Sequence, residues 1–304
     1  MRAAVTGAAG RLGREVLAAL EDAPFTGPFG PIAWSRGIFD LDAPADIGRI
    51  LDRDRPEVVI HCAAWTDVDG CAREPALAMA RNGFATGSLA RATAERSIDL
   101  VVVSTNEVFD GRRTDGVGYR PDDATNPINA YGASKLAGEE AARDAYRSRP
   151  VGLAIARTVW LYGPPGNDFP SKILAAADRA RASGEPLRLV ADEIGSPTYA
   201  RDVADAVVEL IGSGSIGGIH HLVNGGRASR AEWARELLSR AGLDVATEDV
   251  PGSTWPRAST PPTWGVLEPT PLPGGEPLRS WQAALADHLP SLVRDRAKAA
   301  AASR

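Results

Sequence analysis

The stretch RAAVTGAAGRLG, residues 2–13, decides the fold class of this 304-residue chain. Its apolar start, Arg2–Thr6, is typical of a buried strand, and glycines at the spacing G-x-x-G-x-x-G follow at once. Gly7, Gly10 and Gly13 would allow a tight turn, a close approach of the backbone to a pyrophosphate, and close packing of the next helix on the strand. The stretch therefore predicts a dinucleotide-binding turn, although a glycine-rich turn without a ligand would have the same pattern.

Short apolar runs alternate with amphipathic stretches through the first half of the chain. The expected strands are Arg2–Thr6, Pro31–Trp34, Val58–His61, Leu100–Ser104 and Val151–Arg157, and the expected helices are Leu12–Leu20, Ile47–Arg53, Pro75–Glu95 and Tyr131–Tyr146. Strands that alternate with helices imply right-handed crossovers. The fold class predicted from this pattern is α/β, with a Rossmann-type, doubly wound parallel sheet.

The alternation breaks after Leu161, where a Pro/Gly-rich loop spans residues 162–166. Beyond it we expect helices at Ser171–Ser183, Arg201–Ile211, Glu232–Ala241 and Ser280–Leu289, and strands at Leu187–Val190 and Gly218–Val223, the last joining the main sheet. The Ala/Arg-rich tail from Arg294 is expected to be frayed. We predict a dinucleotide-binding lobe of residues 1–160 and 199–223, and a smaller, discontinuous substrate lobe of residues 161–198 and 224–304.

Composition restricts the class of protein. The formal net charge is -5 without a basic block, which argues against a nucleic-acid partner. The two cysteines are too few for a disulfide framework, and the four histidines show no metal-ligand spacing, so we expect a reducing compartment and no metal. No apolar run approaches the ~18 residues of a membrane span, and the first strand leaves no room for a signal peptide. We expect a cytoplasmic protein without a membrane partner.

The end of the second expected strand bears on cofactor choice. An acid at this place selects NAD, whereas an arginine accommodates the 2′-phosphate of NADP. The chain reads Trp34-Ser35-Arg36 here, without an acid until Asp40. Arg36 therefore favours NADP(H), with NAD(H) as the alternative; a solvated surface arginine would also fit the pattern.

Tyr131 and Lys135 are spaced to lie on one helix face, one turn apart. A nearby ammonium would lower the pKa of a tyrosine below its ordinary value of ~10, so that Tyr131 could act as a general acid towards a carbonyl oxygen. Tyr-x-x-x-Lys also occurs by chance in surface helices. Thr105 strengthens the catalytic interpretation, because it ends the fourth strand, at the sheet edge where ligands bind in open parallel sheets.

In ordered segments along nearly its whole length, the chain resembles the dTDP-4-dehydrorhamnose reductases, which are extended short-chain dehydrogenases. The segments are Thr6–Gly13, Cys62–Asp69, Ser104–Gly111, Asn126–Glu139, Arg157–Gly163 and Gly195–Thr198. The resemblance implies reduction of the 4-keto group of a nucleotide-activated 6-deoxy sugar by NADPH or NADH. It is compatible with a homodimer as well as with a monomer.

The resemblance also implies a role for individual residues. Tyr131 corresponds to the proton donor, Lys135 to its partner that holds the nicotinamide ribose, and Thr105 to the hydroxyl that polarises the ketone. Trp160 corresponds to an aromatic residue facing the sugar, although a core tryptophan would fit equally, and Asn106 falls in the substrate segment. Cofactor contacts are implied for Gly10, Arg11 and Leu12 at the pyrophosphate, Asp40 and Leu41 at the adenine, and Ala64, Trp65 and Thr66 beside the central ribose and phosphates.

Two departures from the family pattern leave alternatives open. Asn106-Glu107 stands where Asp-Tyr is usual, and Asp168-Phe169 where Asn-Phe is commoner. A sugar-nucleotide 4,6-dehydratase resembles the chain through a Thr-Asp-Glu segment, but the amide of Asn106 has no proton that titrates in range. A 4-epimerase escapes this objection. A third alternative is a non-catalytic subunit like the regulatory subunit of methionine adenosyltransferase, because fold similarity does not determine function.

Overall fold

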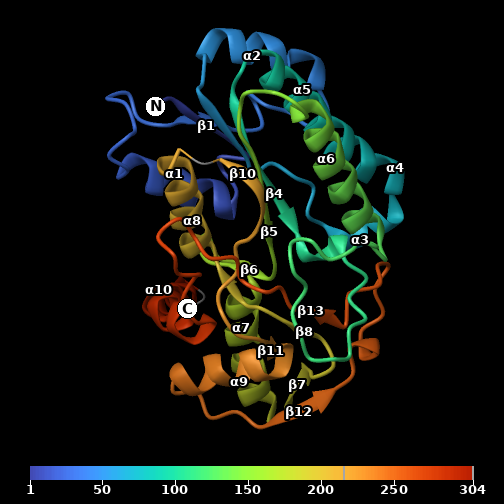
Figure 1. The fold of residues 1–304 in the computed structure, drawn as a ribbon. Helices are drawn as coiled ribbons and strands as arrows, with labels where there is room; N and C mark the ends of the chain where they lie inside the picture. The colour runs from blue at the N-terminus through green and yellow to red at the C-terminus, as the bar shows by residue number, and fades with distance from the viewer. Residues whose placement is uncertain (215, 303–304) are drawn as a thin grey trace.

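A computed structural model describes the backbone of residues 1–214 and 216–302, and the side chains of these residues up to Arg296. Its centre is a six-stranded sheet in the order β10-β5-β4-β3-β1-β2, in which all neighbouring strands are parallel (Figure 1). The strands are β1 (Ala3–Thr6), β2 (Ile32–Trp34), β3 (Val58–His61), β4 (Asp99–Thr105), β5 (Leu153–Thr158) and β10 (Gly217–His221). The predicted α/β fold class is confirmed, as is the return of the chain to the main sheet through β10.

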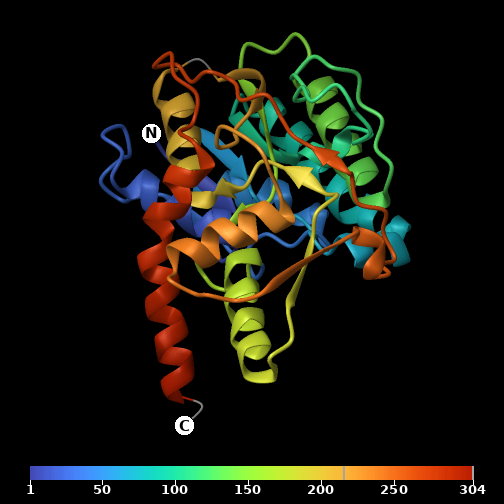
Figure 2. The same ribbon diagram turned by 90° about the horizontal axis from the view of Figure 1, so that it is seen from below.

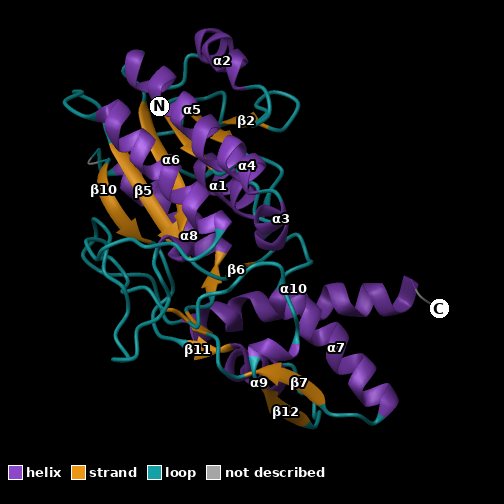
Figure 3. Ribbon diagram, turned by 90° about the vertical axis from the view of Figure 1, so that its right-hand side faces the viewer, coloured by secondary structure: helices purple, strands orange, loops and turns teal. Residues whose placement is uncertain are grey.

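Helices cover both faces of this sheet because successive strand residues point to opposite sides. Val5 packs with α1 (Arg11–Glu21) and α8 (Ala200–Gly212), whereas the neighbouring Ala4 packs on the other side. That other side carries α2 (Ile47–Asp54), α5 (Ala85–Glu95) and α6 (Ala130–Tyr146), as Figure 3 shows in side view. The apolar runs are therefore buried on both faces, as a doubly wound sheet requires.

The predicted single helix over Pro75–Glu95 is interrupted. The segment forms α4 (Pro75–Ala78), a π-helical turn η2 (Met79–Phe84) and then α5, and it follows the short helix α3 (Val68–Arg73). Close packing on α6 accompanies the interruption, because a Cβ added at Gly138 would lie 2.7 Å from the carbonyl oxygen of Asn82. Single π turns inside α-helices occur frequently at functional sites.

The second half builds smaller sheets below the main one (Figures 1 and 2). Three small sheets pair β12 with β7, β8 with both β11 and β13, and β6 with β9. Their strands are β6 (Leu161–Tyr162), β7 (Leu187–Val190), β8 (Ile194–Gly195), β9 (Thr198–Tyr199), β11 (Ala228–Ser229), β12 (Thr247–Val250) and β13 (Trp264–Gly265). Helices α7 (Phe169–Ser183), α9 (Arg230–Arg240) and α10 (Trp281–Ala302) enclose an apolar cluster around the buried Trp233.

Helix α10 is longer than predicted. We expected it to end at Leu289 and the tail from Arg294 to be frayed, but the helix continues to Ala302, and residues 303–304 lie outside the described part. The Ala-rich tail has high intrinsic helix propensity, and Arg296 forms an ion pair with Asp178 of α7. Among the described residues, no helix is long and apolar enough to cross a membrane.

Candidate active site

Two adjoining cavities follow the carboxyl edge of the main sheet, with volumes of about 600 and about 210 Å³. Both are lined by Gly7 and Arg36, so they form one continuous hollow. Every site residue predicted from the sequence lines one or both of them. The predicted residues that line the larger cavity are Gly7, Gly10, Arg11, Leu12, Gly13, Arg36, Ala64, Thr66, Thr105, Asn106, Tyr131, Lys135 and Trp160. The smaller cavity is lined in addition by Asp40, Leu41 and Trp65.

The glycine turn leaves no room for side chains. Gly7 has a φ of +63°, and a Cβ there would lie 2.8 Å from the backbone nitrogen of Ala63. A Cβ at Gly13 would lie 2.3 Å from the carbonyl oxygen of Gly7. Gly10 is the N-cap of α1 and offers no side-chain cap, so the first amides of this helix face the cavity free to bind an anion. The turn therefore fits a dinucleotide pyrophosphate.

The opposite wall is the segment 63–66, which a polar network behind it holds in place. The hydroxyl of Thr6 accepts a hydrogen bond from the backbone nitrogen of Ala63 at 3.1 Å. The buried amide of Asn82 accepts from the backbone nitrogen of Trp65 at 2.8 Å and donates to its carbonyl oxygen at 3.0 Å. Asn82 lies in the π turn and also donates to the hydroxyl of Ser134 on α6. It is a positioning residue that sequence reasoning missed.

The smaller cavity contains two arginines. Arg36 is exposed and faces Asp42, with 3.4 Å between its Nη2 and a carboxylate oxygen. Asp42 also accepts two hydrogen bonds from Arg81, at 2.6 and 2.7 Å. The guanidinium of Arg81 lies 5.2 Å from the ring centroid of Trp65. Arg81 was not expected here, because it lies in the interrupted helix, far along the chain from Arg36.

Tyr131 and Lys135 both lie on α6, one turn apart as predicted. Asn129 caps this helix, its side-chain oxygen accepting from the backbone nitrogen of Gly132 at 2.8 Å. Thr105 ends β4 and lines the same cavity as both residues, and its hydroxyl donates to the side-chain oxygen of Asn106 at 3.3 Å. The three predicted catalytic residues therefore share one end of the larger cavity.

The predicted direction of the Tyr131 pKa is wrong. Burial raises this pKa above its ordinary value, the charges of Glu107 and Cys71 raise it further, and the hydrogen bond with Thr105 opposes them. Lys135 does not lower it, because the ammonium is buried and donates to the carbonyl oxygen of Val103 at 2.8 Å. Burial lowers the pKa of Lys135 itself to about 8. Tyr131 is therefore a neutral phenol at physiological pH and carries the proton that a general acid must supply.

Trp160 follows β5 with a left-handed φ of 47°, a conformation that costs about 1–3 kcal/mol for a residue other than glycine. Its half-buried ring stacks on Trp233, with centroids 6.0 Å apart and planes 6° from parallel. The guanidinium of Arg230 lies 3.6 Å from the centroid of the Trp160 ring. The ring thus lines the cavity and packs on the apolar cluster at once, which combines both interpretations of this residue.

A cluster of charged residues beyond Trp160 was not predicted. Glu193 forms ion pairs with Arg230 and Arg257, and all three line a third cavity of about 270 Å³ together with Asn106 and Glu107. Burial lowers the pKa of Arg230 to about 10. Glu193 directly precedes β8, Arg230 begins α9 and Arg257 lies in a Pro-rich loop, so no local spacing in the sequence could have connected them. Paired guanidinium groups of this kind suit a diphosphate.

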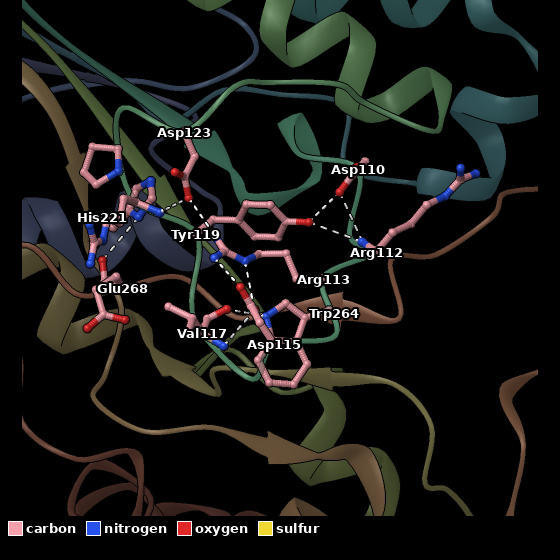
Figure 4. A network of polar contacts seen from close by, with 12 residues as sticks. Asp110, Arg112, Arg113, Asp115, Val117, Tyr119, Asp123, His221, Trp264 and Glu268 are labelled. Atoms are coloured by element: carbon pink, nitrogen blue, oxygen red, sulfur yellow. Dashed lines mark hydrogen bonds and ion pairs between the residues drawn. The ribbon is translucent and has the colours of Figure 1, made fainter.

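The loop after Glu107 is held by a network of polar contacts (Figure 4). Tyr119 donates to the carboxylate of Asp110 at 2.5 Å, and the indole of Trp264 donates to the carbonyl oxygen of Val117 at 2.9 Å. The second bond ties β13 to this loop, and a Cβ at Gly265 of β13 would lie 2.7 Å from the amide nitrogen of Asn106. Asn106 is thereby fixed at the floor of the site.

Asp168 faces away from these cavities. Its carboxylate accepts from the backbone nitrogens of Gly163 and Ser171, each at 2.9 Å, and so caps α7. Burial raises the pKa of Asp168, but the nearby ring of His288 and hydrogen bonds from Ser171 and Gly163 outweigh it and lower the pKa to about 2. The departure at this position is therefore a helix cap, and its carboxylate is not part of the lining of either cavity.

The chain matches the family described as RmlD substrate binding domain over residues 1–294. It is 36% identical over 297 residues to the dTDP-4-dehydrorhamnose reductase of Streptomyces griseus, covering 95% of this chain and 93% of that protein. It is 35% identical over 301 residues to the dTDP-4-keto-6-deoxy-D-glucose reductase of Streptomyces niveus, covering 96% and 97% of the two chains. Among solved structures, the dTDP-4-dehydrorhamnose reductase of Bacillus anthracis in complex with NADP superposes with a TM-score of 0.85 at 30% identity, covering 95% and 99%.

The match runs over almost the whole chain, and the relatives are covered almost completely in turn. The resemblance read from the sequence is thereby confirmed. This chain belongs to the RmlD substrate binding domain family, the family of the dTDP-4-dehydrorhamnose reductases.

Proposed function

We propose that this chain is an oxidoreductase that uses NADPH to reduce the 4-keto group of a nucleotide-activated 6-deoxy sugar, with dTDP as the nucleotide. The observation that carries the proposal is the meeting of Thr105, Tyr131 and Lys135 in one cavity with the glycine turn. The names of the relatives, two of which are reductases of dTDP-linked sugars, support the substrate class. NADPH is favoured by Arg36 and by the NADP complex of the Bacillus anthracis relative.

The cofactor would supply the hydride that is added to the keto carbon. The turn from Gly7 to Gly13 would hold its pyrophosphate on the free amides of α1, and Lys135 would hold the nicotinamide ribose. The backbone of segment 63–66, braced by Asn82, would face its central ribose and phosphates.

Tyr131 would donate its proton to the oxygen of the ketone as negative charge develops there. Its raised pKa keeps the phenol protonated at neutral pH, so the residue is ready in the direction of reduction. Thr105 would donate a second hydrogen bond to the same oxygen. Its hydroxyl is free to turn from Asn106, to which it donates over a long 3.3 Å. Together the two hydroxyls would stabilise the developing alkoxide.

The nucleotide end of the substrate would lie beyond Trp160. Arg230 and Arg257 provide cationic groups for the diphosphate, and both already pair with Glu193. An adjacent cavity of about 410 Å³ adds Lys172, Arg188 and the exposed Trp255. Basic and aromatic side chains are the groups that bind phosphates and bases.

The division into a cofactor lobe of residues 1–160 and 199–223 and a substrate lobe of residues 161–198 and 224–304 is part of the proposal. The apolar cluster around Trp233 supports it, because that cluster is separate from the two that flank the main sheet. We also propose a cytoplasmic location, which the free thiols of Cys62 and Cys71 support.

A dehydratase would need a proton donor at Asn106, and this amide cannot titrate. A non-catalytic subunit would need neither Tyr131 nor Lys135 at the cavity. The deciding experiment is to mix the purified chain with NADPH and either dTDP-4-dehydrorhamnose or dTDP-4-keto-6-deoxy-D-glucose, following absorbance at 340 nm. Stoichiometric oxidation of NADPH with formation of the alcohol is expected; no oxidation of NADPH with either sugar would contradict the proposal.

A further inference from the structure

The smaller cavity holds a carboxylate between two guanidinium groups. Asp42 binds Arg81 through both carboxylate oxygens, at 2.6 and 2.7 Å, and one of these oxygens lies 3.4 Å from Arg36. Both arginines line the cavity with Asp42 itself. The cavity also contains Gly7 and Ala63, where the glycine turn meets the opposite wall.

The two arginines differ in exposure and in how firmly they are held. Arg36 has 77% of its side chain exposed, whereas the Arg81 side chain is only 23% exposed and lies over the ring of Trp65. Trp65 is held through its backbone by the buried Asn82, next to Arg81 in the π turn. Arg81 is therefore a preorganised cationic group, and Arg36 is a more exposed one that lines the same cavity.

We infer that Arg36 and Arg81 form a joint site for the 2′-phosphate of NADP(H), and that Asp42 is its built-in competitor. The inference rests on the proposed use of a nicotinamide dinucleotide and adds two residues to it. Asp42 occupies the position between the guanidinium groups that the phosphate would take, as a carboxylate of the same charge sign and similar bidentate geometry. The phosphate must displace this carboxylate or bind beside it.

Either route makes Asp42 a specificity-determining residue. If the phosphate displaces the carboxylate, the Asp42–Arg81 bonds are lost; if it binds beside the carboxylate, the two like charges repel each other. In both cases Asp42 selectively weakens the binding of ligands that carry a 2′-phosphate. A ligand without that phosphate leaves the pair intact. The arrangement would reduce the preference for NADP(H) that two arginines alone would give and would keep NAD(H) usable.

Binding of adenosine 2′,5′-bisphosphate and of 5′-AMP, measured by calorimetry, tests the inference without turnover. The two probes share the adenosine 5′-phosphate and differ only in the 2′-phosphate. We expect Asp42→Asn to increase the affinity for the bisphosphate by roughly tenfold and to leave the affinity for 5′-AMP nearly unchanged. Adding Arg81→Gln in the Asp42→Asn background should remove that gain, and Arg36→Gln should weaken the bisphosphate in either background.

A matched control is Asp52→Asn, which breaks an exposed pair with Arg96 of similar geometry on the distant helix α2. It should alter neither affinity. If Asp42→Asn leaves the bisphosphate unchanged, or if Arg81→Gln weakens both probes by the same factor, Arg81 does not contact the 2′-phosphate and the inference is wrong. A failure of the proposed sugar reduction would look different, because both probes would still bind while no keto sugar was reduced.

Discussion

Lys135 donates a hydrogen bond of 2.8 Å to the backbone carbonyl oxygen of Val103, two residues before Thr105 on β4. This bond ties the helix that carries Tyr131 to the strand that carries Thr105, and it directs the ammonium towards the sheet. Glu139 and Cys62 favour the charged form, but burial outweighs both. A buried cation at this place therefore has a cost in stability.

Lys135→Met should change the pH dependence of stability in a defined direction. The pKa of Lys135 falls from 10.5 to about 8 on folding, so between these values the unfolded chain binds more protons than the folded one. The stability of the wild type should therefore rise, relative to that of the variant, by up to about 3 kcal/mol between pH 7 and pH 10.5. Urea unfolding across this range measures the difference, and Lys172→Met, at an exposed position, is the control. A difference that does not vary with pH would show that the ammonium is not desolvated.

Tyr131→Phe should lower kcat by roughly 10²–10⁴-fold, the usual worth of a placed general acid. Cofactor affinity should change little, because the phenol is needed chiefly in the transition state. The matched control is Tyr146→Phe on the same helix, whose hydroxyl bonds to Thr93 and Ile98 far from the cavity. That variant should lose stability and keep its turnover. Near-normal turnover of Tyr131→Phe at every pH would refute the assignment and direct attention to Glu107.

The parts of the site that local patterns encode were predictable. The glycine turn, the strand that ends in Thr105 and the helix spacing of Tyr131 and Lys135 each depend on a few neighbouring residues, and the sheet then brings their ends together. We could predict that these residues meet, because the strands of a parallel sheet place their carboxyl ends at one edge. The resemblance to the family supplied Trp65 and Trp160.

The missed residues depend on contacts that no local pattern records. Arg81 lines the smaller cavity and Asn82 braces its wall from a π turn that interrupts their helix, where the chain packs tightly against α6. Arg230 and Glu193 meet only after the second half has folded. The direction of the Tyr131 pKa was wrong for a related reason: spacing places two side chains on one helix face, but only the fold shows that the ammonium is bonded to Val103.

Glu107→Gln should lower the pKa of Tyr131, measured from the phenolate absorbance in alkali that the Tyr131→Phe substitution removes. The carboxylate of Glu107 accepts a hydrogen bond from the amide of Asn129 at 2.6 Å. Its negative charge raises the pKa of Tyr131. Removing that charge should make Tyr131 ionise more readily and so lose its proton earlier as pH rises. The exposed Glu140 on the same helix provides the control variant Glu140→Gln. If that phenolate titration does not shift, Glu107 does not act on Tyr131.

The same substitution should also affect stability, with a sign fixed by the pKa of Glu107. Burial raises this pKa above 4.5, against the hydrogen bond from Asn129, so the folded chain holds the proton more tightly than the unfolded chain. The wild type therefore loses stability as pH rises from 4.5 through the raised value. Glu107→Gln should gain over the wild type at pH 7 and show no such gain at pH 4, in thermal unfolding at both pH values.

Trp160→Phe should weaken binding of the substrate more than binding of the cofactor. The indole lines the cavity, lies under the guanidinium of Arg230 and stacks on Trp233. The smaller ring of phenylalanine would make a weaker cation–π contact with this guanidinium. We expect KM for the keto sugar nucleotide to rise while NADPH affinity stays the same, together with a stability loss of about 1–2 kcal/mol from the weaker stacking and cation–π contacts. Trp281→Phe, in the same apolar cluster but outside the lining of the cavity, should lose stability with unchanged kinetics. If Trp160→Phe behaves like Trp281→Phe, the tryptophan serves the core, and the sugar must be recognised by other residues of the cavity.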